Sequence, residues 1–283
     1  MVKKKTSKLF LKIIILLLCA YQLDINKNHV SKLSNNKICS LLEINKIDNN
    51  IIKYGISEFN LEGFFYYYRN KADTECMILI NKKEINVIFI GTETTNGLES
   101  LIKDFITDFN LGILTIDIDV NNVGIHKPYK KNMEQSNFIY KIINIILKYN
   151  NKKLIISGHS AGCGGAVYLS IILNEKYNYK KKLKLVLISS PKLGNKNLAK
   201  YIENNDNIKL YTMINNYELP PLFPFYPFFP SYSNVGNKIY RYKNDGTCEI
   251  LKSMPANFFI YSSIKDHLCI SSIKNVFTNI IEK

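Results

Sequence analysis

The sequence predicts an α/β fold, with a mainly parallel central sheet and helices on both of its faces. Strand-like and helix-like segments alternate along most of the chain, as they do where helices connect parallel strands. Several strand-like runs are almost wholly apolar, which is typical of strands buried on both faces. The 283 residues, 46% of them hydrophobic, are enough for one substantial core. No repeat or linker divides the chain, so we expect a single domain over residues 21–283.

Residues 1–20 are expected to be a targeting segment. A lysine-rich start is followed by the apolar run Ile13–Cys19 and the small residue Ala20, an order that resembles a secretory signal. The run is too short to span a bilayer comfortably, and Leu18 is a poor residue three positions before a cut after Ala20. We therefore expect either a cleaved signal peptide, giving a secreted protein, or an uncleaved signal anchor, giving a membrane-tethered one.

The first part of the domain is expected to contain helices and then a hairpin. Residues 29–60 read as one or two helices, bounded by Gly55 and Gly63. Met77–Ile80 and Ile85–Ile90 are expected to pair as a hairpin. The second of these strands is apolar enough to lie at the centre of the sheet.

The alternation of helices and strands follows from residue 98 onward. The expected helices are Leu98–Phe109, Met133–Tyr149, a segment beginning at Ala161, Asn197–Glu203 and a last segment after His267. The expected strands are Ile113–Ile118, Leu154–Ser157, Leu183–Ile188, Ile208–Ile214 and a second hairpin within Lys238–Leu251. Between them, Pro220–Tyr232 is rich in proline and aromatic residues and is expected to be a loop.

Charge and cysteine content narrow the classes of partner. The formal charge is +15, but the basic residues are scattered and no nucleic-acid motif accompanies them, so we expect no nucleic-acid partner. Attraction to an anionic membrane surface is the better interpretation. Cys39, Cys76, Cys248 and Cys269 could form two disulfides in any of three pairings, and Cys163 is expected to be a free thiol. No CxxC motif or metal-like His/Cys spacing occurs, so we expect no metal and no cofactor.

One short motif indicates the chemistry. An apolar strand runs into Gly158-His159-Ser160-Ala161-Gly162 and then into a small-residue helix start. This G-x-S-x-G arrangement predicts a nucleophile elbow, in which the glycines allow a turn tight enough to expose the Ser160 hydroxyl. The alternative, a glycine-rich helix start that binds an anion, does not explain the other motifs. Ser160 is therefore the predicted nucleophile of an α/β-hydrolase fold.

A serine nucleophile needs a base, and in this fold the chain order is serine, acid, histidine. His267 is the only histidine after Ser160. His159 directly precedes the nucleophile, and its side chain is expected to point elsewhere. His267 is therefore the predicted base.

The chain resembles the fungal-type, or class 3, lipase family from about Glu75 to its C-terminus. Five segments in order are similar to the family's motifs: Phe89-Ile90-Gly91-Thr92, Ile125-His126-Lys127-Pro128-Tyr129, Gly158-His159-Ser160-Ala161-Gly162, Ser190-Pro191-Lys192-Leu193-Gly194-Asn195 and Asp266-His267-Leu268. The departures are Ile90, Pro128 and Cys163, which stand where the family has Arg, Gly, and Gly or Ala. They affect local packing more than chemistry.

The resemblance also indicates the acid and the oxyanion donors. Aligning the prolines of the family's D-x-V-P-x-L-P pattern places Glu218 at the acid position, and a glutamate can orient and stabilise the imidazole. Asp206 and Asp245 are interpreted as turn residues, and Asp266 as an anchor of the His267 loop. The elbow supplies the backbone N–H of Ala161 to the oxyanion.

The resemblance implies that Thr92 is a second oxyanion donor and that His126 is structural. Two further segments bear on the substrate. Residues 94–105 lie where the family carries a lid helix, although an ordinary core helix fits the pattern nearly as well. Residues 222–230 are too aromatic for a solvated loop, so Phe223, Phe225, Phe228 and Phe229 are expected to line an acyl pocket or to contact a lipid interface.

The predicted function is hydrolysis of lipid carboxylic esters, as by a triacylglycerol lipase, through an acyl-serine intermediate. Phospholipase A1 or monoacylglycerol-type activity would use the same three residues, Ser160, Glu218 and His267. If the chain is not an enzyme, the alternative is a lipid-binding homologue that is catalytically silent.

Overall fold

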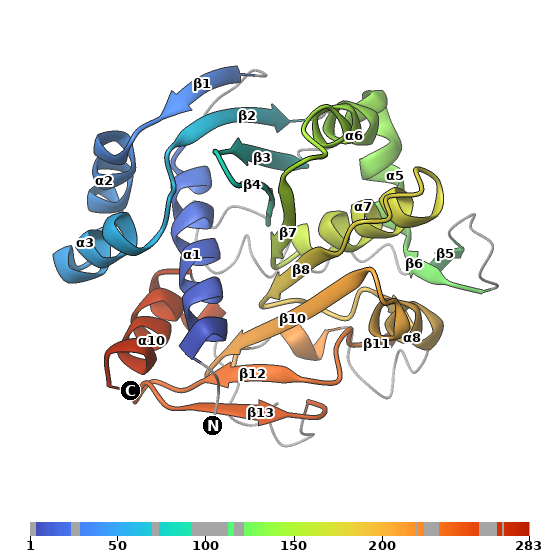
Figure 1. Cartoon of the computed structure of the whole chain (residues 1–283). Coiled ribbons are helices and arrows are strands. Elements are labelled where there is room, and N and C mark those ends of the chain that lie inside the picture. The colour runs from blue at the N-terminus through green and yellow to red at the C-terminus, as the bar shows by residue number, and fades with distance from the viewer. Residues whose placement is uncertain are drawn as a thin grey trace.

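The computed structural model describes residues 4–23, 29–69, 74–91, 113–115, 122–218, 220–223, 232–254, 265–267 and 269–282. Nine of the described strands form one sheet in the order β1-β2-β3-β4-β7-β8-β10-β12-β13 (Figure 1). Their bounds are β1 (His29–Leu33), β2 (Gly63–Arg69), β3 (Glu75–Ile80), β4 (Glu84–Ile90), β7 (Lys153–His159), β8 (Leu183–Ile188), β10 (Ile208–Asn215), β12 (Ile239–Tyr242) and β13 (Cys248–Leu251).

The sheet is parallel at its centre and antiparallel at both edges. Strands β4, β7, β8, β10 and β12 pair in parallel, whereas β1, β2 and β3 at one edge and β13 at the other pair antiparallel. The predicted α/β class and both predicted hairpins are confirmed. The sheet is more mixed than expected because β1 and β2, which were not predicted, add further antiparallel pairs beside β3.

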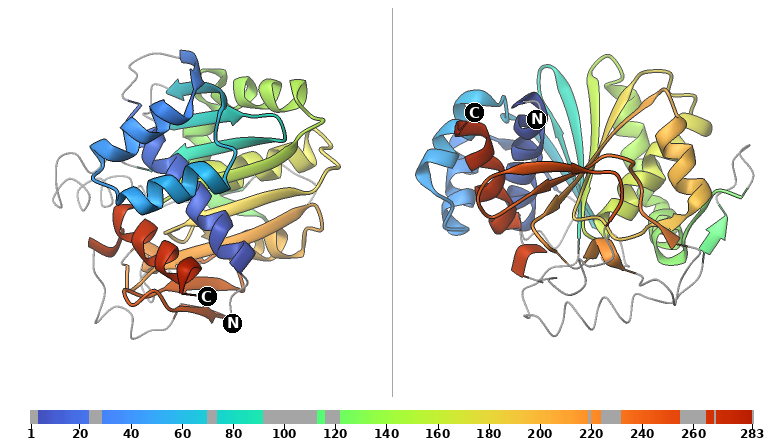
Figure 2. Two further views of the ribbon diagram at one scale, coloured as in Figure 1. Left: turned by 60° about the vertical axis from the view of Figure 1, so that its left-hand side comes forward. Right: turned by 90° about the horizontal axis from the view of Figure 1, so that it is seen from below.

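Helices cover both faces of this sheet (Figure 2). One face carries α1 (Lys4–Tyr21), α2 (Asn35–Ile44), α3 (Asn49–Glu58) and α10 (Cys269–Ile281); the other carries α5 (Lys127–Glu134), α6 (Phe138–Lys148), α7 (Gly162–Glu175) and α8 (Lys196–Asn204). Neighbouring strand residues point to opposite faces. On β4, for example, Ile88 packs against the α1 side and Phe89 against the α7 side. The site lies at the end of the sheet where β7 meets α7.

The segment predicted as a targeting sequence forms the buried helix α1. It lies between the sheet and α10, and the side chains of Ile13–Leu17 have no exposed surface. Ser7 is within hydrogen-bond distance of Tyr242 and Asn279, and Lys12 forms an ion pair with Glu84 at the start of β4. Within the described residues, no helix is both long and apolar enough to cross a membrane. Cleavage after Ala20 and tethering to a membrane both stay predictions.

A second, four-stranded sheet lies beside α7 and α8, in the order β11-β9-β6-β5. Its strands are β5 (Ile113–Thr115), β6 (Gly124–His126), β9 (Gly194–Asn195) and β11 (Tyr232–Ser233). The described part of the strand predicted at residues 113–118 is β5, which pairs with β6 and so lies in the second sheet rather than in the main one. Strands β1 and β2 were not predicted, while the helices expected in residues 29–60 are α2 and α3.

Two expectations about individual residues are settled by packing. Cys39, Cys76 and Cys269 carry free thiols, so the two possible disulfides are absent. His126 is buried, and its Nδ1 lies 2.8 Å from the hydroxyl of Tyr232 in the second sheet. This contact fits the structural role that was expected of His126.

Candidate active site

Ser160 occupies a sharp turn between β7 and α7. Its φ of 53° lies in the left-handed region, which is unusual for a residue with a side chain. The backbone N–H of Ser160 donates to the carbonyl oxygen of Ile188 at 3.0 Å, which ties the turn to the end of β8. The predicted elbow is thus present, and the turn is held by the neighbouring parallel strand.

The two glycines of the motif are required by close backbone contacts. A Cβ on Gly158 would lie 2.6 Å from the Cα and N of Cys163, and a Cβ on Gly162 would lie 2.6 Å from the carbonyl oxygen of Phe89. Both distances are shorter than any ordinary carbon contact, and the opposing atoms belong to the backbone. The motif therefore allows α7 to fold back onto β7 and onto the end of β4.

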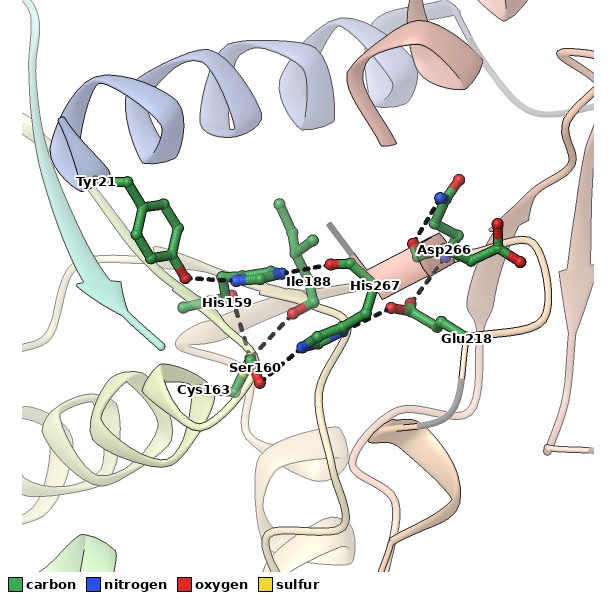
Figure 3. A network of polar contacts seen from close by, with 10 residues as sticks. Tyr21, His159, Ser160, Cys163, Ile188, Glu218, Asp266 and His267 are labelled. Carbon is green, nitrogen blue, oxygen red and sulfur yellow. Dashed lines mark hydrogen bonds and ion pairs between the residues drawn. The ribbon is translucent and has the colours of Figure 1, made fainter. Parts of the chain in front are cut away.

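Ser160, His267 and Glu218 form a continuous hydrogen-bonded chain (Figure 3). His267 Nε2 lies 2.9 Å from Ser160 Oγ, and His267 Nδ1 lies 3.0 Å from Glu218 Oε2. A carboxylate can only accept, so Nδ1 carries the hydrogen and Nε2 is left to accept the hydrogen of the serine hydroxyl. The structure thus brings together the three residues that were predicted from separate motifs.

Glu218 follows β10 and is fully buried. Its Oε1 accepts the backbone N–H of Asn215 at 2.8 Å, which leaves Oε2 directed at His267. The competing aspartates lie elsewhere. Asp206 is in an exposed turn, and Asp245 accepts the N–H of Thr247 at the tip of the β12–β13 hairpin.

Asp266 holds the loop that carries His267, as expected. Its carboxylate accepts from the Asn216 side chain at 2.8 Å, and its carbonyl oxygen accepts from the Asn215 side chain at 2.7 Å. Because Asn215 also contacts Glu218, the residues that follow β10 fix the acid and the histidine loop together.

Burial controls the protonation of this chain of residues. It lowers the pKa of His267 to about 3, because the imidazolium form would lose its hydration. Burial also raises the pKa of Glu218, and the hydrogen bonds that its carboxylate accepts, including that from the Asn215 N–H, oppose this shift and favour the carboxylate form. His267 is therefore held neutral at neutral pH, which is the form that can accept a proton from Ser160.

One of the two expected oxyanion donors, Ala161, lies beside Ser160. Ala161 directly follows it and caps α7, so its backbone N–H is at the elbow. Thr92 lies outside the described residues, but Gly91 before it is described. A Cβ on Gly91 would lie 2.8 Å from the Cβ of Ser160, so the end of β4 is adjacent to the nucleophile.

The residues expected to contact substrate are mostly outside the described part of the chain. Residues 94–105, Phe225, Phe228 and Phe229 belong to this group. Phe223 is described: it is half-buried, and its carbonyl oxygen accepts the N–H of Lys192 at 2.7 Å.

Two residues of the site were missed by sequence reasoning. The ring of His159 stacks on that of His267, and its Nε2 lies 3.2 Å from the carbonyl oxygen of His267. Its Nδ1 lies 2.8 Å from the hydroxyl of Tyr21 at the end of α1. His159 does point away from the Ser160 hydroxyl, as expected, but its contact with the histidine loop was not foreseen. No local signal marks Tyr21, which is 138 positions away from its partner.

Comparison with known proteins places this geometry in context. Residues 87–227 match the family model described as Lipase (class 3). No curated protein sequence matches the chain. Many solved structures do match it.

Three of these structures illustrate the likeness. The lipase of Rhizopus microsporus var. chinensis is 17% identical over 94% of this chain and 87% of its own, with a TM-score of 0.66. A triacylglycerol lipase whose catalytic centre is formed by a serine protease triad is 16% identical over 85% and 96%, with a TM-score of 0.60. A fungal lipase–inhibitor complex that served as a model for interfacial activation is 15% identical over 99% and 98%, with a TM-score of 0.66. At these identities the likeness establishes the fold.

Proposed function

Because the chain belongs to the class 3 lipase family, and is therefore a carboxylic ester hydrolase, we propose that it cleaves lipid esters through an acyl intermediate on Ser160. The observation that carries this proposal is the hydrogen-bonded chain from Ser160 through His267 to the buried Glu218. The order and roles are those of a serine triad, with glutamate in place of aspartate.

In the first half of the reaction, Ser160 Oγ attacks the ester carbonyl carbon while His267 Nε2 takes the hydroxyl proton. The negative oxygen that develops is stabilised by the N–H of Ala161 and, as the family resemblance implies, by Thr92. The imidazolium is stabilised by Glu218. His267 then gives its proton to the leaving alkoxide, which departs as an alcohol and leaves the acyl-enzyme.

In the second half, water replaces the alcohol. His267 takes a proton from a water molecule that attacks the acyl carbon, and the tetrahedral intermediate collapses to a free carboxylic acid. The proton returns to Ser160 Oγ, so the enzyme is regenerated. His267 carries the proton in each of these transfers, from Ser160 to the leaving alcohol and from water back to Ser160.

The favoured substrate class is triacylglycerol, the substrate named for one of the similar structures. The aromatic residues Phe223, Phe225, Phe228 and Phe229 are proposed to contact acyl chains or a lipid surface, because four phenylalanines within a proline-rich loop suit an apolar ligand better than water. A positively charged surface would add attraction to anionic lipid. Phospholipase A1 and monoacylglycerol-type activities would use the same triad.

Product analysis tests the substrate class. Purified enzyme is given mixed vesicles and emulsions that contain triacylglycerol, phospholipid and monoacylglycerol, and the released species are identified by mass spectrometry. Release of diacylglycerol and fatty acid supports the proposal. Lysophospholipid as the main product would assign a phospholipase A1 activity instead.

The aromatic loop has its own test. Replacing Phe228 and Phe229 by Ser is expected to lower hydrolysis of emulsified lipid much more than hydrolysis of a short soluble ester. An equal loss on both substrates would show that these rings support the fold rather than contact lipid.

A further inference from the structure

The hydroxyl of Tyr21, at the end of helix α1, lies next to the active site. This hydroxyl lies 2.8 Å from His159 Nδ1 and accepts the backbone N–H of Gly91 at 3.2 Å. His159, which contacts Tyr21 in Figure 3, immediately precedes the nucleophile, and in the sequence Gly91 immediately precedes the expected oxyanion donor Thr92. A single side chain from the N-terminal helix therefore contacts both sides of the site.

The direction of each hydrogen bond follows from the chemistry of the partners. The carbonyl oxygen of His267 can only accept, so the hydrogen of His159 lies on Nε2. In a neutral imidazole Nδ1 is then an acceptor, and Tyr21 must donate its hydroxyl hydrogen to it. The hydroxyl oxygen of Tyr21 accepts the N–H of Gly91. Burial lowers the pKa of His159 to about 3 and so keeps the ring in this neutral form.

The same contacts restrain the imidazole of His267. The rings of His159 and His267 are stacked, with centroids 4.8 Å apart and planes inclined by 22°. His159 also holds the backbone of His267 through Nε2 at 3.2 Å. Any rotation of the His159 ring would therefore disturb the group that accepts the Ser160 proton.

Tyr21 is itself held rigidly by α1. The helix is buried between the sheet and α10, and Ser7, fourteen residues before Tyr21, contacts Tyr242 on β12. The ion pair between Lys12 and Glu84 fixes the helix to the strand that ends at the site. The position of the Tyr21 hydroxyl is thus determined by the packing of the whole helix.

We propose that Tyr21 is a positioning residue for the ester hydrolysis, acting through His159 on His267 and through Gly91 on the oxyanion side of the site. The proposal rests on the proposed function of Ser160 and His267, and it makes α1 a part of the working enzyme. In this proposal Tyr21 acts through His159 and Gly91, so its effect is on the rate of the chemical step.

The variant Tyr21→Phe tests this proposal because it keeps the ring and removes only the hydroxyl. On a soluble p-nitrophenyl ester, kcat is expected to fall about 10- to 100-fold with little change in KM. The concentration of active sites is measured by titration with a fluorophosphonate that reacts with Ser160. The rate is divided by this concentration, so misfolded protein does not lower the value of kcat.

Tyr242→Phe is the matched control. It removes a buried hydroxyl that contacts the same helix at Ser7, fourteen residues before Tyr21. This control is expected to keep wild-type turnover per site even if its melting temperature falls. Equal turnover in wild type and Tyr21→Phe, or an equal loss in both variants, would overturn the positioning role.

A double-mutant cycle tests whether Tyr21 acts through His159. Adding Tyr21→Phe to His159→Ala is expected to lower kcat much less than Tyr21→Phe does alone, since the partner is already gone. Fully additive losses would contradict action through His159. A wild-type enzyme that is neither active nor labelled at Ser160 would instead overturn the proposed function. Failure of the positioning role of Tyr21 can thus be distinguished from failure of the proposed ester hydrolysis.

Discussion

The imidazole of His159 lies stacked on that of His267, 4.8 Å away between ring centroids, although His159 is next to the nucleophile and His267 is 107 residues beyond Ser160. Both rings are buried, and for both burial lowers the pKa to about 3. Two neutral rings can stack in this way, whereas two imidazolium ions would repel each other.

This relationship predicts a specific pH dependence of stability. His159 has a pKa of about 3 in the folded state and near 6.5 when unfolded, so between these values the unfolded state binds more protons and acid destabilises the wild type. In His159→Gln this contribution is absent. The free energy of unfolding of the wild type minus that of His159→Gln should therefore shrink as the pH falls from 6.5 to 5, by up to about 1.4 kcal/mol per pH unit.

Urea unfolding of both proteins at pH 7, 6 and 5 measures this difference. A deficit that stays constant over the whole range would mean that His159 titrates alike in the folded and unfolded chains. The comparison of two proteins removes the contributions of Glu218 and other groups that both share.

The assignment of the acid predicts a large effect of Glu218→Gln. The amide keeps the volume but removes the charge that stabilises the His267 imidazolium, so turnover should fall about 10³- to 10⁴-fold. Glu218→Asp should recover part of this loss, because it keeps the charge with a shorter reach. Turnover of a soluble ester is measured for each variant after folding is checked by circular dichroism.

Asp206→Asn and Asp245→Asn are the controls for this prediction, since both aspartates lie in exposed turns. Each should hydrolyse the ester at close to the wild-type rate. A collapse of activity in either control, with near-normal rates for Glu218→Gln, would move the acid to that aspartate.

The elbow geometry predicts that Gly158→Ala is severely destabilising. The new methyl group would lie 2.6 Å from backbone atoms of Cys163, so the start of α7 would have to move away from β7. We expect a loss of about 3 kcal/mol or more in the free energy of unfolding. In the control Gly55→Ala the methyl group meets only the end of the Ile15 side chain, and stability should change by about 1 kcal/mol or less.

The burial of α1 predicts that its apolar residues contribute to stability. Leu16 has no exposed surface, so Leu16→Ala should lower the free energy of unfolding by about 2–5 kcal/mol. The exposed Lys5 is the control, and Lys5→Ala should leave stability within about 0.5 kcal/mol of wild type. Identical stabilities of wild type and Leu16→Ala, together with an N-terminus at Tyr21, would show that α1 is removed from the mature protein.

The parts of this molecule that were predictable from sequence are those with a local signal. Ser160 was identified because its flanking glycines and the preceding strand lie within ten residues, and His267 because it is the only histidine after Ser160. Glu218 required the family's proline pattern in addition. The central strands were predictable because both of their faces are apolar.

The features that were not predicted depend on contacts between residues far apart in the sequence. Strand β1 has only five residues, and β2 has aromatic residues on both faces, since Phe64 is exposed and Phe65 is buried, so no alternation of polar and apolar residues marks it. The burial of α1 could not be foreseen, because an apolar run such as Ile13–Cys19 has the same composition whether it enters a membrane or a protein core. Tyr21 was missed for the same reason, since its role exists only once α1 has packed.

Labelling with a fluorophosphonate, followed by mass spectrometry, tests the central claim most directly. The wild-type enzyme should gain one adduct, located on Ser160, and lose its esterase activity in proportion to labelling. Ser160→Ala should gain no adduct and should hydrolyse esters about 10⁴- to 10⁶-fold more slowly while remaining folded. An adduct on another residue, or wild-type rates from folded Ser160→Ala, would contradict the assignment of Ser160 as the nucleophile.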